Sequence, residues 1–166
     1  FFDECVIYFY QIWCLNNLSI ETDIKLHPVG EEISYCIYKC YLDKKHFNKV
    51  NIIYGVSGEM IVYKYKIIII DYLPSALTDH ILALDIPVII YDVNFSSLKI
   101  KAPFMTDLMN RCYIARNKEQ LSKLVTKFAE GKLVSKLDDN FLDQYIVPSH
   151  DLEPCEKITK YIESII

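Results

Sequence analysis

The sequence predicts an α/β protein in which about five parallel strands form one doubly wound sheet, followed by C-terminal helices. Short apolar runs alternate with amphipathic helical patterns along most of the chain, which is the pattern of successive βα units. The run 66–71 holds consecutive isoleucines without alternation, which is typical of a strand buried on both faces of a parallel sheet. Because 166 residues with 52% hydrophobic side chains suffice for one core, we expect a single domain over 1–166.

The first half of the chain predicts three strands, with helices before the first of them and between them. The run 3–17 is apolar on a broad face and ends in Asn-Asn, as a buried helix would. The run 31–45 is an amphipathic helix with acidic residues in its first turn, where the helix dipole favours them. Its predicted apolar stripe comprises Ile33, Cys36, Ile37, Cys40 and Tyr41. Strands are expected at 22–28, at 50–55 and at 66–71, and the isoleucine run makes the last of these the expected central strand.

The second half repeats the alternation. About two turns of helix at 57–65 lead into the isoleucine strand, and strands are expected again at 87–92 and 112–117. Asn117 caps the clearest amphipathic helix in front, and Gly131 ends it. Further helices are expected at 74–84, 103–111, 138–145 and 155–166.

Composition and charge exclude several classes of function. The chain has 18 basic and 22 acidic residues without a dense basic block, so no nucleic-acid partner is expected. No apolar stretch approaches the roughly 20 residues that cross a bilayer. The six cysteines are irregularly spaced, which indicates reduced, buried thiols in a reducing compartment. Cys36 and Cys40 have metal-ligand spacing, but no matching His or Cys pair lies nearby, so a zinc site is not expected.

The carboxyl ends of the strands are where a ligand is expected, since doubly wound sheets bind ligands there. His27 directly follows a predicted strand, and Pro28 fixes the direction in which the chain leaves, which would hold His27 at the rim. A histidine at the end of a buried strand is more often a hydrogen-bonded structural residue, and this alternative stays open.

Two further strand ends carry candidate residues. Ser75 follows the isoleucine strand and can cap the next helix, whose free backbone N–H groups and positive dipole end would suit a phosphate. Capping alone also explains Ser75. In the loop "GVSGE" at 55–59, Gly55 would approach a base or ribose, although ordinary turns look the same. Neither GxGxxG nor GxxxxGK[ST] occurs, so the usual dinucleotide and P-loop fingerprints are absent.

Taken together, "DIKLHP" at 23–28 and "IIIIDYLPSALTDHILALDIPVIIYD" at 67–92 resemble the C-terminal, donor-binding half of the GT-B glycosyltransferases that build bacterial surface polysaccharides. Bacterial sialyl- and polysialyltransferases, capsule transferases and CDP-glycerol glycerophosphotransferases share a strand ending in His-Pro and a later strand-loop-helix with Ser. The helical stretches at 115–132, 141–145 and 157–166 are similar to the end of such domains. The resemblance covers nearly the whole chain through short, degenerate motifs and implies a Rossmann-like fold.

The resemblance also implies roles for individual residues. His27 would be the histidine of the His-Pro motif, where it would contact the donor phosphate or assist the leaving group. Ser75 would bind a phosphate oxygen, with help from the amides of Ala76 and Leu77. A departing nucleoside phosphate accumulates negative charge, and preorganised donors aimed at that charge lower the barrier.

The implied substrate is a nucleotide-activated sugar or polyol, linked to CMP, CDP or UDP, and the reaction would need neither a cofactor nor a metal. Two positions depart from the family pattern. Pro74-Ser75 stands where relatives often have two adjacent small hydroxyl residues, and Asp79 stands where many carry Glu. The identity of the donor therefore stays open.

A complete GT-B enzyme also has an N-terminal domain that binds the saccharide acceptor and usually carries the catalytic base. The resemblance thus implies the donor half of a larger cytoplasmic enzyme, inactive alone and compatible with peripheral attachment at the inner face of the plasma membrane. The rival from another class is a non-catalytic α/β interaction or regulatory domain in which His27 and Ser75 are structural. A flavodoxin-like or response-regulator-like domain is less favoured, because no acidic cluster follows the first predicted strand.

Overall fold

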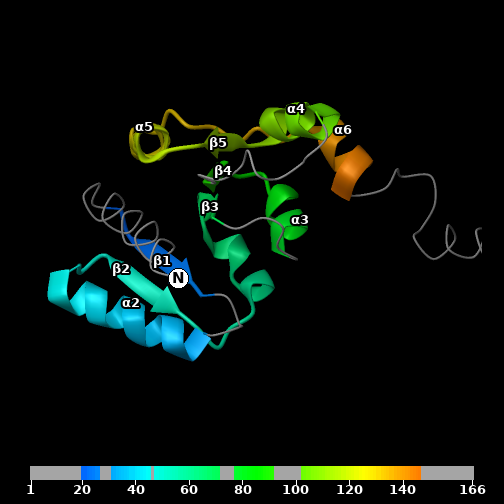
Figure 1. Cartoon of the computed structure of the whole chain (residues 1–166). Coiled ribbons are helices and arrows are strands. Elements are labelled where there is room, and N and C mark those ends of the chain that lie inside the picture. The colour runs from blue at the N-terminus through cyan, green and yellow to red at the C-terminus, as the bar shows by residue number, and fades with distance from the viewer. Residues whose placement is uncertain (1–19, 27–30, 46, 72–76, 92–101, 147–166) are drawn as a thin grey trace, which may run out of the picture.

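The computed structural model describes residues 20–26, 31–45, 47–71, 77–91 and 102–146. In these ranges parallel strands form two small sheets with helices between them (Figure 1). The predicted α/β architecture with parallel strands is therefore confirmed. The predicted helices at 3–17 and 155–166 lie outside the described residues.

The smaller sheet consists of β1 (Thr22–Lys25) and β2 (Val50–Ile53), which pair in parallel. The helix α2 (Glu31–Lys45) connects the two strands and packs along one face of the sheet (Figure 1). The buried residues of this layer are Leu42 and Val50. Partly buried side chains surround them, namely Ile24, Tyr38, Tyr41, Phe47 and Ile52.

The predicted apolar stripe of α2 was wrong at two positions. Cys36 and Cys40 are exposed, whereas Tyr38, Tyr41 and Leu42 form the face that packs on the strands. Both stripes have helical spacing, and the one with the larger side chains is buried because aromatic rings and leucine remove more apolar area from water than a thiol does. The expectation of buried thiols holds for Cys112 but not for these two cysteines.

The larger sheet consists of β3 (Ile68–Ile70), β4 (Val88–Tyr91) and β5 (Tyr113–Ala115), in the order β3-β4-β5 and all parallel. Its central strand is β4, which is buried at every position. The isoleucine strand β3, expected to be central, lies at the edge of this sheet. An apolar run indicates that both faces of a strand are covered. It does not indicate how many neighbouring strands form hydrogen bonds with it, so the position of β3 within the sheet could not be predicted from the run.

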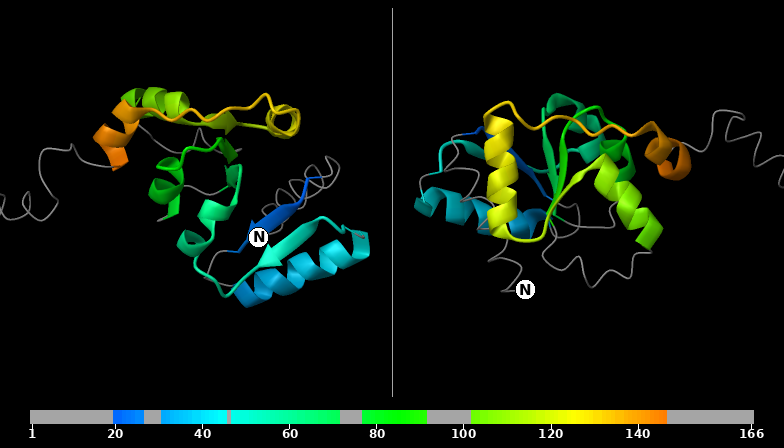
Figure 2. Two further views of the ribbon diagram at one scale, coloured as in Figure 1. Left: turned by 180° about the vertical axis from the view of Figure 1, so that it is seen from behind. Right: turned by 90° about the horizontal axis from the view of Figure 1, so that it is seen from above.

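Helices cover both faces of the larger sheet (Figure 2). Val88 and Ile90 point into a core shared with α3 (Leu77–Leu82), α4 (Ala102–Arg111) and α6 (Asp139–Phe141). Ile89 and Tyr91 point into the opposite core, which contains Leu121 and Val125 of α5 (Lys118–Ala129). Successive strand residues face opposite sides, so one buried strand supplies both cores.

Two short helices connect the sheets. The 3-10 turns η1 (Gly58–Met60) and η2 (Val62–Lys64) occupy the segment where about two turns of helix were expected. After them the Tyr65 hydroxyl donates a 2.8 Å hydrogen bond to the Asp23 carboxylate of β1. The same carboxylate accepts from the Asn51 amide of β2 at 3.1 Å. Asp23 thereby joins both strands of the smaller sheet to the entry of β3.

The predicted boundaries of α5 are confirmed by its capping contacts. The Asn117 side chain accepts a 2.9 Å hydrogen bond from the backbone N–H of Gln120, and Gly131 adopts a φ of 69° just beyond the helix. A single π-helical turn, η4 (Leu142–Ile146), continues α6. No helix in the described ranges is both long enough and apolar enough to cross a membrane.

Candidate functional site

Five of the predicted site residues lie outside the described ranges, and three lie inside them. The residues outside are His27, Pro28, Pro74, Ser75 and Ala76. Gly55, Leu77 and Asp79 are described, and they lie in the segments that follow β2 and β3. These two segments, 54–60 and 77–80, are called the strand-end region below.

The structure brings the two halves of the strand-end region into contact. Gly58 of η1 lies so close to α3 that a Cβ atom at this position would meet Cδ2 of Leu77 at 2.5 Å. One residue further, Oε1 of Glu59 lies 3.6 Å from Nε2 of His80. The chain after β2 and the helix after β3 are therefore neighbours, although their positions are about 20 residues apart in sequence.

The exposed polar and backbone groups of this region are available to a ligand. Gly55 is exposed and has a φ of 68°, a left-handed conformation that glycine adopts without a steric penalty. Asp79 is exposed in the first turn of α3, whereas Leu77 is half-buried and packs on the core below. Gly55 thus presents its backbone groups and Asp79 its carboxylate to the solvent, and Leu77 holds α3 on the core.

Two polar residues, one beside the strand-end region and one within it, were not among the site residues predicted from the sequence. Asp71 directly follows β3, and desolvation by the surrounding protein raises the pKa of its carboxyl group. Water that reaches its exposed side chain reduces this effect. The Thr78 hydroxyl in α3 is buried and has no hydrogen-bond partner among the described residues. The signal for Asp71 was its position after the isoleucine strand, whereas nothing in the sequence marked Thr78.

An aromatic pair flanks the region. The rings of Tyr54, at the end of β2, and Tyr35, in α2, have centroids 4.4 Å apart. Exposed apolar side chains continue along the connection at Val56, Met60 and Tyr63, of which the last two are more than 70% exposed. The sequence did not mark Tyr35, Tyr54 and Tyr63 as special, because tyrosine is common throughout the chain.

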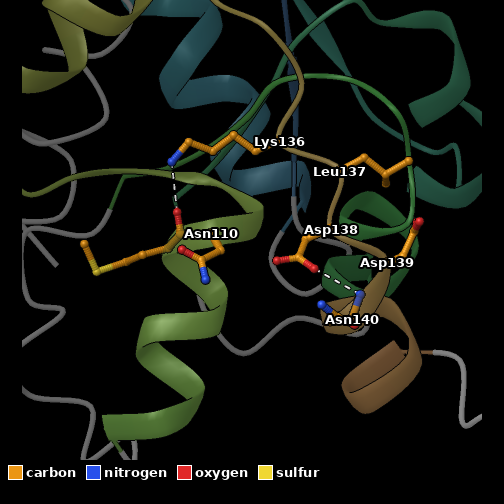
Figure 3. A pocket seen from close by; sticks show the side chains of 7 residues that line it. Asn110, Lys136, Leu137, Asp138, Asp139 and Asn140 are labelled. Carbon is orange, nitrogen blue, oxygen red and sulfur yellow. Dashed lines mark hydrogen bonds between the residues drawn. The ribbon is translucent and has the colours of Figure 1, made fainter.

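The described surface also carries a shallow depression of about 610 Å³ at a different place. It lies between the end of α4 and the start of α6, and Figure 3 shows Asn110, Lys136 and Asp138 around it. Its floor and walls come from 109–110 and 136–140. None of the predicted site residues contributes to it.

The charged groups of this depression hold the fold together. The Lys136 ammonium donates a 2.9 Å hydrogen bond to the carbonyl of Met109 (Figure 3). It also donates to the carbonyl of Cys112 at 3.3 Å and lies over the Tyr113 ring. The Asp138 carboxylate caps α6 by accepting from the backbone of Asn140 and Phe141. Because these groups satisfy helix ends, the depression offers a ligand few uncommitted charges.

Comparisons with family models, with curated proteins and with solved structures find no match. In the described part of the chain, no group of three or more His, Cys, Asp and Glu side chains is placed to hold a metal ion. The strand-end region is the best candidate site because the segment after β2 and the helix after β3 meet there.

Proposed function

We propose that the chain is the donor-binding half of a metal-independent glycosyltransferase of bacterial surface polysaccharide synthesis. Its ligand is a nucleotide-activated sugar or polyol, linked to CMP, CDP or UDP. The saccharide acceptor is bound by a separate N-terminal domain, and the isolated chain does not turn over. The enzyme acts in the cytoplasm, where it can associate peripherally with the inner face of the plasma membrane.

The contact between η1 and α3 carries this proposal. It supports a site that combines the loop after β2 with the helix after β3, because Gly58 packs on Leu77 and Glu59 approaches His80. In the proposal, Gly55 approaches the base or ribose, and Ser75 and the amides of Ala76 and Leu77 bind a phosphate. Strand ends that meet at one place are where open α/β sheets bind ligands.

The proposal places the two sheets in one doubly wound, Rossmann-like arrangement with β1 beside β3. The hydrogen bond from Tyr65 to Asp23 and the packing of Ile20 on the core that contains Ile67 and Ile69 support it. The proposal requires that His27, one residue past the buried Leu26, lie within reach of the same ligand as Ser75. His27 then contacts the donor phosphate or assists the departing nucleotide, and Asp71 accepts hydrogen bonds from ribose or sugar hydroxyl groups.

Thermal-shift assays with CMP, CDP, UMP, UDP and GDP test the proposal. A ligand at a hundred times its dissociation constant stabilises the folded state by about 2.7 kcal/mol. We expect a cytidine or uridine nucleotide to raise the melting temperature of the wild type and of His46→Ala, but not of His27→Ala. His46→Ala is the matched control, because it makes the same change at a histidine that is not among the proposed site residues. A shift retained in His27→Ala would exclude His27 from the site.

The exposed apolar side chains after β2 favour a second candidate, a non-catalytic interaction domain. Met60 and Tyr63 are 73% and 71% exposed, as expected of residues that a partner covers. In this case no nucleotide shifts the melting temperature, and replacing Met60 and Tyr63 with serine removes binding of the partner. Nucleotide binding that survives both serine substitutions would favour the glycosyltransferase.

A further inference from the structure

The outer face of α2 carries two free thiols that the proposed function does not use. Cys36 and Cys40 are both exposed and both unpaired, one helical turn apart. Free cysteine is among the most frequently buried residues, so an exposed pair on one helix face calls for a physical reason. The packing face of α2 lies elsewhere, at Tyr38, Tyr41 and Leu42, so neither thiol is needed for the core.

The spacing of the two thiols suits a bridging ion and not a disulfide. Residues four apart on a helix have Cβ atoms about 5–6 Å apart. A disulfide requires a Cβ separation of about 3.5–4.5 Å, so a bond between Cys36 and Cys40 would distort α2. Two metal–thiolate bonds of about 2.3 Å, the length typical of zinc, allow the sulfurs to lie up to about 4.6 Å apart. Side chains on the same helix face reach that separation by rotation about χ1.

We propose that Cys36 and Cys40 form a two-sulfur site for a soft monovalent metal ion, with Cu(I) as the representative ion. Thiolates select soft ions, and Cu(I) is satisfied by two sulfur ligands. Zn²⁺ prefers four ligands, and no group of three or more suitable side chains is assembled in the described ranges.

The binding step is a proton exchange without electron transfer. Each thiol loses its proton to solvent as an S–Cu bond replaces the S–H bond, and copper keeps its charge of one. The resulting bis-thiolate complex carries one net negative charge. Lys39 is exposed on the same helix, three residues after Cys36, and its ammonium lies over the Tyr35 ring, 5.6 Å from the centroid. From this helix surface its charge partly offsets that of the complex.

Two rearranged variants, which have the same composition as each other, test the spacing of the thiols. Cys36→Ser/Asp43→Cys leaves thiols at 40 and 43, which are three residues apart on one face. Cys40→Ser/Asp43→Cys leaves thiols at 36 and 43, which are about 10 Å apart along the helix axis. Both variants retain two exposed thiols and Lys39, and both lose the exposed carboxylate of Asp43.

The measurement is an anaerobic competition of the reduced, full-length chain against a chromophoric Cu(I) chelator such as bicinchoninate. We expect the wild type and the 40/43 variant to withdraw one more equivalent of copper than the 36/43 variant. Far-ultraviolet circular dichroism checks that α2 is intact in all three proteins. Equal withdrawal by the two rearranged variants would overturn the proposal, as would binding of Zn²⁺ to the monomer as tightly as Cu(I).

Discussion

The two sheets are built from the same parallel βα units, yet the described helices cover them to different extents. Every residue of β4 in the larger sheet is buried, and its side chains enter two cores on opposite faces. In β2 of the smaller sheet only Val50 is buried, and a single core lies against α2. The other side of the smaller sheet presents polar residues such as Asp23 and Asn51, which hydrogen-bond to each other.

The comparison indicates that one sheet is a rigid support and the other depends on it. Buried apolar area supplies most of the free energy of folding, and most of that area lies around β4. The smaller sheet is tied to this support through Tyr65 and Asp23. The strand-end region lies where the connection from the smaller sheet reaches α3 of the larger one, so a ligand bound there would stabilise the junction.

Replacing an isoleucine with alanine should lower the free energy of unfolding much more in the larger sheet than in the smaller one. Ile89→Ala in β4 removes a side chain with 0% exposure, and we expect it to lower the free energy of unfolding by about 4 kcal/mol. Ile52→Ala in β2 removes a half-buried side chain and should cost about 1 kcal/mol. Urea unfolding followed by circular dichroism measures both. Equal losses would contradict the view that the larger sheet carries most of the stability.

A buried arginine, Arg111, links two of the helices that cover the larger sheet. Arg111 has 0% exposure and donates to the carbonyl of Leu82, the last residue of α3, at 2.6 Å and to that of Leu84 in the turn beyond it. Burial lowers the pKa of its guanidinium, which nevertheless remains protonated at neutral pH. Arg111→Met leaves both carbonyls without these donors and should cost about 3 kcal/mol.

The matched control for this arginine is Arg116→Met, which makes the same change at an exposed position and should alter stability by less than about 0.5 kcal/mol. Chemical denaturation of both variants gives the two values. If Arg111→Met were as stable as the wild type, the guanidinium would not be a structural link between α3 and α4.

The sequence predicted the elements of both sheets well because their patterns are local. The strand starting at Thr22, the helix from Glu31 to Lys45 and the cap at Asn117 depend on spacing, acidic first turns and side-chain capping. These signals are contained within a few residues and are insensitive to the rest of the fold. Element type could therefore be predicted from one chain.

The arrangement of these elements was harder to predict. Two overlapping apolar stripes competed on α2, and only the strands beneath decide that Tyr38 and Leu42 face inward while Cys36 faces water. The central position of β4 depends on hydrogen-bonded neighbours that are distant in sequence. For the candidate site, the sequence located Gly55 and Leu77 in the segments after two strands, but the contact between these segments, of Gly58 with Leu77, depends on the packing of η1 against α3.

The hydrogen bond between the sheets should make a smaller contribution. Tyr65→Phe removes the donor to Asp23, and because this bond is exposed we expect a loss of about 0.5 kcal/mol. Amide hydrogen exchange should show faster opening of β1 and β2 but unchanged protection of β4. Uniformly faster exchange would indicate that the two sheets open together.

Alkaline pH provides a second readout for the same bond. Desolvation, with the hydrogen bond and the charge of Asp23, raises the pKa of Tyr65 from 10.0 to about 12. A raised pKa in the folded state means that this stabilisation is complete below the ordinary value and is lost as the pH rises through about 12. The difference in stability between wild type and Tyr65→Phe should therefore shrink over that window.

The smallest effect is expected where the strand-end region meets the larger sheet. Desolvation raises the pKa of Asp71 above its ordinary value of 3.8, so the folded state favours the protonated carboxyl. The stability that this group contributes is present below pH 3.8 and is lost as the pH rises through the folded-state pKa. At neutral pH the ionised side chain therefore slightly destabilises the folded state, and Asp71→Asn should raise the melting temperature.

That gain should vanish on acidification, because below both pKa values the wild type is also uncharged at this position. Asp79→Asn is the control, since it removes an exposed carboxylate in the first turn of α3 and should leave the melting temperature unchanged or slightly lower at neutral pH. Thermal melts of the wild type, Asp71→Asn and Asp79→Asn from acidic to neutral pH distinguish the effect of the desolvated carboxylate from that of the exposed one. A stabilisation by Asp71→Asn that persists in acid would show that desolvation of the charge is not its cause.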